Sequence, residues 1–173
     1  TDGSEASMCL NGVRSVGAFV WEEKLVPKKS TLLGTKSKEV MIQPTASKNV
    51  KTIIDFPFEE KIPQNDMKLL AKELNVCFIN AGNHHLLIES KKIDSYDLSG
   101  LCDRLRKRKF FRDANISLWT KSGKSILSRT NEAGAGETLS CGSAAAAIAS
   151  IALKKGKGVT VISKGGKISL KSL

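Results

Sequence analysis

A cysteine that follows a glycine-rich segment and precedes a run of alanines has surroundings suited to acid–base chemistry. Cys141 comes after Gly134 and Gly136, and it is followed by Gly-Ser and by a helix-forming run over residues 144–153. This pattern places Cys141 at a helix N-terminus, where free backbone N–H groups and the helix dipole favour an anion. A thiol in that place is expected to have a lowered pKa and more thiolate character. The alternative is a buried structural cysteine that caps a core helix.

A second cysteine near the start of the chain has similar surroundings. When Cys9 is aligned with Cys141, residues 4–20 overlie residues 136–152. Both copies have a glutamate four residues before the cysteine and a helix rich in small residues after it. A repeat at this distance predicts two related lobes rather than a solenoid. If the two lobes face each other, two cysteines flank one anion site.

The first lobe requires a helix directly after Cys9. Residues 9–24 are expected to form it, and four apolar residues are expected to face inward: Val13, Val16, Phe19 and Val20. Short strands are expected over residues 39–43 and 50–56. The polar, proline-bearing segment 59–64 suggests a boundary between lobes 1–61 and 62–173.

The second lobe has more strand signals than helix signals. Strands are expected over residues 76–80, 86–89, 114–119 and 125–130, and a hairpin is expected around Lys164-Gly165-Gly166. Helices are expected over residues 67–71, 97–109 and 144–153. We therefore predict an α+β fold with two pseudo-symmetric lobes, each a curled, mainly antiparallel sheet wrapped around a central helix.

Composition excludes several classes of function. The 173 residues are 40% hydrophobic and 26% charged, which is ordinary for a globular protein, and no apolar run is long enough to span a membrane. The four cysteines form no CxxC pair, and we expect them to be free thiols in a reducing compartment. We expect no metal site, because the only histidines, His84 and His85, are adjacent and have no metal-type spacing to a cysteine.

The net charge of +11 raises the question of nucleic acid as a partner. The densest basic run, residues 104–109, follows leucines at helical spacing, and only 5% of the residues are aromatic. A solvated helix face accounts for this run, so we expect no nucleic-acid partner; a basic protein with a small anionic substrate has the same composition.

Several motifs together resemble diaminopimelate epimerase, a family of amino-acid epimerases that work without a cofactor. They are Asp2-Gly3-Ser4-Glu5 through Cys9, Asn11-Gly12, Gly82-Asn83 with His85, Asn115, and Glu132 through Ser143. The resemblance covers most of the chain in the right order. It implies the two-lobed fold and the interconversion of LL- and meso-diaminopimelate for lysine and peptidoglycan synthesis. It also implies no pyridoxal phosphate, a cytoplasmic location and a homodimer.

The resemblance also implies roles for individual residues. Cys9 and Cys141 are the two acid–base residues, and His85 and Glu132 tune the two thiols. Substrate contacts are carried over to Leu10, Asn11, Asn83, Asn115, Glu132, Ala133, Gly142 and Ser143. These roles are consistent with the chemistry of the reaction. Inversion by two bases needs one acid–base group on each side of the α-carbon. The carbanion needs preorganised hydrogen-bond donors, such as the N–H groups at helix starts.

Departures from the family keep other hypotheses open. The family's arginine after Glu132, which grips the distal carboxylate, is replaced by Ala133, and the glycine after the first cysteine is replaced by Leu10. The family's N-terminal and final C-terminal strands are also absent from this sequence, which is either a fragment or a reduced relative. The alternatives are an epimerase or racemase of the same fold with another substrate, and an inactive relative that acts as a binding module.

Overall fold

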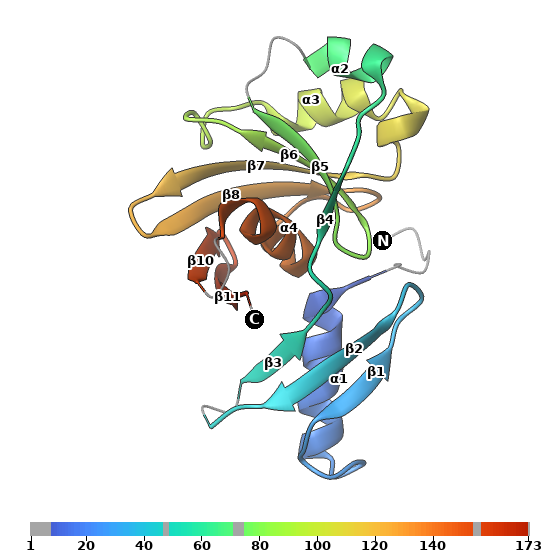
Figure 1. Ribbon diagram of the computed structural model, residues 1–173, viewed down its shortest axis with the longest axis vertical. Helices are drawn as coiled ribbons and strands as arrows, with labels where there is room; N and C mark the ends of the chain where they lie inside the picture. Colours follow the sequence, from blue (N-terminus) through green and yellow to red (C-terminus); the bar gives the residue numbers. More distant parts are fainter. Residues whose placement is uncertain (1–7, 47–48, 71–74, 154–156, 173) are drawn as a thin grey trace. The chain divides into compact units, whose positions relative to one another are not determined.

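The computed structural model describes residues 8–46, 49–70, 75–153 and 157–172. Four α-helices and eleven strands lie in these ranges, as an α+β fold (Figure 1). The described residues up to Asp55 form one compact unit, and those from Phe56 onward form a larger one. Each unit is described by itself.

The smaller unit is one helix packed on a three-stranded antiparallel sheet of order β1-β2-β3. Its elements are α1 (Leu10–Glu22), β1 (Thr31–Gly34), β2 (Glu39–Pro44) and β3 (Val50–Ile53). Helix α1 packs against β2 and β3. At Gly17 a side chain would come within 2.8 Å of Ile42, so this glycine lets helix and sheet approach closely.

The expectation that α1 buries Val16 and Phe19 is wrong in this structure. Their exposed fractions are 48% and 56%, while Val13, Gly17 and Trp21 form the buried stripe. The sheet covers only one face of α1, and helical periodicity cannot tell how many faces of a helix are covered.

The larger unit is built on an eight-stranded mixed sheet of order β11-β10-β8-β7-β6-β5-β4, with β9 paired to β8. The strands are β4 (Phe58–Glu60), β5 (Val76–Asn80), β6 (His84–Glu89), β7 (Asn115–Ser122), β8 (Ser125–Glu132), β9 (Gly136–Thr138), β10 (Gly158–Ser163) and β11 (Gly166–Lys171). The pairs β6–β7 and β8–β10 are parallel, and the others are antiparallel.

The two faces of this sheet carry separate cores. One face packs against α2 (Gln64–Leu70), α3 (Leu98–Leu105) and the 3₁₀ turn Lys109–Phe111, and the other curls around α4 (Gly142–Ala152), as Figure 1 shows. Side chains alternate between faces along a strand. Leu87 and Trp119 therefore meet α4, while Leu86 and Leu118 meet the α3 side.

Two expected boundaries differ from those in the structure. Strand β4 pairs with β5, and the units divide between Asp55 and Phe56, whereas the expected lobe boundary lies between residues 61 and 62. The helix expected over residues 97–109 ends at Leu105. One helix cannot continue to Lys109, because Arg108, directly before the 3₁₀ turn, has an extended backbone with φ −89° and ψ 132°. The side chain of the capping residue Arg106 donates to the side chain and carbonyl of Asn131 at 2.7 and 3.1 Å.

The complete burial of α4 makes it intolerant of larger side chains. Ala147 is fully buried, so Ala147→Leu is expected to destabilise the protein by about 1–3 kcal/mol through overpacking. Urea denaturation followed by circular dichroism measures this loss. The control is Ala18→Leu on the exposed face of α1, for which we expect a change within about 0.5 kcal/mol. Equal effects of the two substitutions would show that α4 is not tightly enclosed.

Candidate active site

Cys141 is the N-cap residue of α4, which confirms the position expected from the sequence. Its backbone is extended, with φ −120° and ψ 113°, and the helix begins at Gly142. The side chain is only 9% exposed, and the next eight residues, Gly142–Ala149, are all buried. The thiol is thus held by a buried helix of the larger unit, which positions it more precisely than a loop would.

The Cys141 thiol contacts two polar side chains, one of which is held by a third. Its S–H donates to Glu132 Oε2 at 3.3 Å, and the Ser143 hydroxyl lies 3.4 Å from the sulfur. The other carboxylate oxygen, Glu132 Oε1, accepts a hydrogen bond of 2.6 Å from the Thr138 hydroxyl. Glu132 and Ser143, both proposed from the sequence, are therefore brought to the thiol, and Thr138 was missed.

The expected lowering of the Cys141 pKa is wrong for this structure. Burial, followed by the charge of Glu132, raises the pKa of this thiol to about 12. The hydrogen bonds from Ser143 and from the Ala144 N–H at the helix start act in the opposite direction but are weaker. The sequence indicated that Cys141 lies at a helix N-terminus. It did not indicate how deeply the thiol is buried, and burial changes the pKa more than the helix N–H groups do. In the structure as described, Cys141 holds a proton.

Asn115 supports the turn that follows Glu132. This asparagine is buried at the start of β7, and its Oδ1 accepts a 3.0 Å hydrogen bond from the backbone N–H of Ala133. Ala133 itself presents only a methyl group. Of the residues predicted to contact substrate, Asn115 and Ala133 are thus in direct contact with each other.

His85 and Asn83 form a second pair on the same sheet. The His85 ring is fully buried, and burial lowers its pKa to about 3, so the ring is neutral. Its Nε2 lies 2.9 Å from Asn83 Oδ1, which can only accept, so Nε2 carries the hydrogen. His85 is the register partner of Asn115 across β6 and β7. Its expected role in tuning a thiol stays a prediction.

The strand register explains why these side chains share a face. Thr130 pairs with Ser117 on β7 and with Thr138 on β9. Because side chains alternate along strands, Glu132 and Thr138 lie on the same face as Trp119, which packs in the core around α4. The polar side chains on this face therefore gather near the N-terminus of α4.

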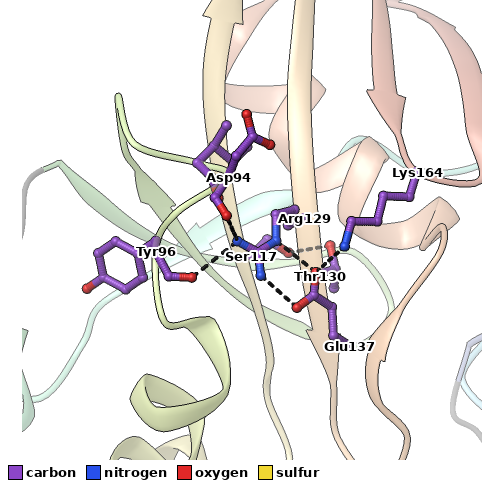
Figure 2. Close-up of polar contacts among 8 residues, drawn as sticks. Asp94, Tyr96, Ser117, Arg129, Thr130, Glu137 and Lys164 are labelled. Atoms are coloured by element: carbon purple, nitrogen blue, oxygen red, sulfur yellow. Dashed lines mark hydrogen bonds and ion pairs between the residues drawn. The ribbon is translucent and has the colours of Figure 1, made fainter.

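An arginine clamp on the opposite face holds β9 in place, as Figure 2 shows. Arg129 grips the Glu137 carboxylate with Nε and Nη2 at 2.7 and 2.8 Å, and Lys164 lies 3.7 Å from the same carboxylate. Arg129 Nη1 also donates to the backbone carbonyls of Ile93, Asp94 and Tyr96 at 2.6, 3.3 and 3.2 Å. The hydrogen bonds from Arg129 lower the pKa of Glu137 and raise that of Arg129. Sequence reasoning missed this clamp, since no local pattern joins its parts.

The backbone just before Cys141 has a further anchor. The N–H of Gly165, in the turn between β10 and β11, donates to the Leu139 carbonyl at 2.7 Å. A side chain at Gly165 would lie 3.0 Å from that oxygen, so a glycine is needed for the close approach.

The smaller unit repeats the arrangement of a cysteine at a helix start. Cys9 is the exposed N-cap of α1, and its sulfur accepts from the backbone N–H of Gly12 at 3.4 Å. Asn11 accepts a hydrogen bond from the guanidinium of Arg14, whose pKa is lowered by burial and raised by the neighbouring Cys9. Leu10 is buried in this unit. Sequence reasoning missed Arg14, and Glu5, expected four residues before Cys9, lies outside the described residues.

The repeat predicted from the sequence therefore corresponds to two cysteines that each cap a helix, one in each unit. Across the ranges that the structure describes, no group of three or more His, Cys, Asp or Glu side chains is placed to hold a metal ion. None of the helices in those ranges is long and apolar enough to cross a membrane.

The sequence of the chain was compared with family models and with known proteins. No family model matches the chain. It is 31% identical over 190 aligned residues to a diaminopimelate epimerase of Methanococcus maripaludis, covering 98% of this chain and 69% of that relative. It is 32% identical over 165 residues to a diaminopimelate epimerase of Acetivibrio thermocellus, covering 86% of this chain and 59% of that relative.

Solved structures show the same fold at low sequence identity. A phenazine biosynthesis protein of the PhzF family from Bacillus anthracis gives a TM-score of 0.71 at 17% identity, covering 98% of this chain and 69% of that one. A hydroxyproline epimerase from Agrobacterium vitis gives 0.63 at 12% identity, covering 92% of this chain and 58% of that one. These likenesses confirm the predicted fold class.

The charge of Glu132 is expected to slow alkylation of Cys141. Because a like charge raises a thiol's pKa, Glu132→Gln should lower the Cys141 pKa and increase its iodoacetamide reaction rate at pH 8 by about three- to tenfold. Peptide mapping after a short pulse measures the rate at each cysteine. Glu89→Gln is the matched control, since Glu89 raises the pKa of Cys77 and not of Cys141. An unchanged Cys141 rate in Glu132→Gln would contradict the assigned contact.

Proposed function

The chain belongs to the diaminopimelate epimerase family, a family of isomerases, and we propose that it interconverts LL- and meso-diaminopimelate with two cysteines as acid and base. In the proposed reaction, one cysteine thiolate takes the α-hydrogen as a proton. The thiol of the other cysteine gives its own proton to the opposite face of the α-carbon. The configuration is inverted, the protonation states of the two cysteines are exchanged, and no external oxidant or reductant is required.

The observation that carries this proposal is the opposite hydrogen-bonding role of the two cysteines. The Cys141 thiol donates to a carboxylate, whereas the Cys9 sulfur accepts from the Gly12 N–H. A two-base inversion needs one proton donor and one proton acceptor at the start of each half-reaction. We therefore propose that Cys141 begins as the acid and Cys9 as the base in one direction of the reaction.

The helix starts can supply the electrostatic stabilisation that the reaction needs. The backbone N–H groups near Leu10 and Asn11 and near Gly142 and Ser143 belong to the first turns of α1 and α4. Such groups are preorganised donors for the negative charge that develops when an α-proton leaves. We therefore propose the reaction without pyridoxal phosphate.

Other residues of the larger unit are proposed to orient the substrate. The carbonyl oxygen of Asn115 is occupied by the Ala133 N–H, so its amide nitrogen is the group that can donate to a substrate carboxylate. Asn83 is fixed through His85 in the same way. Asn11 and Glu132 complete the proposed contacts. We further propose a cytoplasmic homodimer in lysine and peptidoglycan synthesis, in line with the resemblance.

A second candidate function is the epimerisation or racemisation of another amino acid on the same fold. The specific observation that favours it is the alanine at position 133, which offers no charge to a distal carboxylate. An inactive relative that serves as a binding module is the third hypothesis, and it conflicts with the paired cysteines.

Solvent deuterium incorporation tests the proposed reaction. The protein is expected to introduce deuterium at the α-carbon of LL- and meso-diaminopimelate with inversion, measured by mass spectrometry and chiral chromatography. Cys9→Ala and Cys141→Ala should each reduce inversion by about 100- to 10,000-fold, because either change removes one acid–base group. Cys77→Ala, which alters a thiol outside both groups, is the control. Absence of exchange by the folded, reduced protein would refute the proposal.

The residue at position 133 tests the choice of substrate. If diaminopimelate is a poor substrate because a cation is missing, Ala133→Arg should raise kcat/KM for diaminopimelate by about tenfold or more through a charge-assisted hydrogen bond. The same assay with Ala135→Arg, an exposed position in the same turn, controls for added charge. A lower kcat/KM in Ala133→Arg would show that the alanine suits the native substrate.

A further inference from the structure

The carboxylate of Glu132 is held from both of its oxygens. Thr138 Oγ1 donates to Oε1 at 2.6 Å, and the Cys141 thiol donates to Oε2 at 3.3 Å. A carboxylate can rotate about its last bond, but two donors on opposite oxygens define its plane. A hydroxyl is a stronger hydrogen-bond donor than a thiol, so Thr138 is the stronger constraint on Glu132.

The strand register directs the Thr138 hydroxyl to Glu132. In the β8–β9 ladder, Glu132 pairs with Gly136 and Thr130 pairs with Thr138, so Glu132 and Thr138 are diagonal neighbours on one face. Gly136 has no side chain and a positive φ of 75°, which leaves the space between them open. The hydroxyl therefore reaches the carboxylate directly.

The arginine clamp fixes the strand that carries Thr138. Glu137 is the preceding residue, and its side chain points to the other face, where Arg129 holds it with two hydrogen bonds. Arg129 is in turn fixed by the three carbonyls of residues 93–96. The clamp thus sets the position of β9, and through β9 it sets the direction of the Thr138 hydroxyl.

We propose that Thr138 is a positioning residue for the acid–base reaction: its hydroxyl holds the Glu132 carboxylate in the orientation that accepts the hydrogen bond of the Cys141 thiol. This inference rests on the proposed function. It assigns Thr138 no contact with substrate. The residue acts through Glu132, and Glu132 acts on the thiol.

Kinetics of hydroxyl variants test this role. Thr138→Val, which keeps the shape and removes the hydroxyl, should lower the rate of α-deuterium exchange by about tenfold, the size expected for one hydrogen bond to a charged group. Thr138→Ser, which keeps the hydroxyl, should retain the rate to within about threefold. Thr138→Ala is a second hydroxyl-free variant in case the valine does not fit.

A double-mutant cycle separates positioning from a general structural effect. On a Glu132→Ala background, Thr138→Val should change the remaining rate by less than about twofold, since its partner is already gone. Thr130→Val is the matched control, because Thr130 is the register partner of Thr138 and its buried hydroxyl lies 2.9 Å from the Ser117 hydroxyl. We expect Thr130→Val to lose stability in urea but to keep the exchange rate. Additive losses in the cycle would overturn the proposal.

Infrared spectroscopy gives a readout that does not depend on activity. A hydrogen bond from the Cys141 thiol to a carboxylate weakens the S–H bond and lowers its stretching frequency, and the difference spectrum against Cys141→Ala isolates this band. The band should move to higher frequency in Thr138→Val and Thr138→Ala, and stay in place in Thr138→Ser and Thr130→Val. An unmoved band in both hydroxyl-free variants would show that Thr138 does not position Glu132.

The two kinds of failure can be distinguished. If the unaltered protein exchanges no deuterium while the thiol band responds to Thr138 as expected, the proposed function fails and the positioning contact stands. If the protein is active and neither the rate nor the band responds to removal of the hydroxyl, the positioning role fails and the proposed function stands.

Discussion

The burial of a helix made almost entirely of small side chains is the constraint on which the larger unit depends. Eight consecutive residues, Gly142–Ala149, are buried, so the sheet must curl around α4 on several sides. Alanine side chains allow this close approach at low entropic cost. Because a packed interior tolerates little displacement, the start of this helix is held rigidly. Cys141 occupies that start, where this packing and the hydrogen bond from Gly165 to Leu139 hold its backbone.

The same burial creates an electrostatic cost at the cysteine. A thiolate removed from water is disfavoured, and the N–H groups of one helix turn do not offset that effect here. A carboxylate in the same place needs donors of its own, which explains why Glu132 has Thr138 on one oxygen and the thiol on the other. The Arg129–Glu137 clamp lies on the opposite face, where it fixes β9 without placing another charge beside the thiol.

Local patterns were enough to predict the helices that carry the cysteines and most of the strands, because capping, small-residue runs and β-branched runs act over a few residues. Contacts that depend on strand register or join distant parts of the chain were not predictable in this way. Thr138 meets Glu132 only because of a strand register, and Arg129 reaches the carbonyls of residues 93–96 across the fold. Two predictions were wrong for the same reason: that Phe19 faces inward, and that the pKa of Cys141 is lowered. Both depend on how much of a surface is covered, which a single sequence does not state.

The contrast between the two cysteines has a consequence for the proposed reaction. Each turnover exchanges the protonation states, so Cys141 must begin as a thiolate when the reaction runs in the other direction. A thiol with a pKa of about 12 is rarely in that form at neutral pH. Burial is the larger cause of this raised pKa and the charge of Glu132 the second. An amino-acid substrate brings an ammonium group, and a cation beside Glu132 would offset that second cause. Under the proposed function, the bound substrate thus lowers the pKa of the Cys141 thiol. The thiolate then becomes accessible in the complex in which proton transfer takes place.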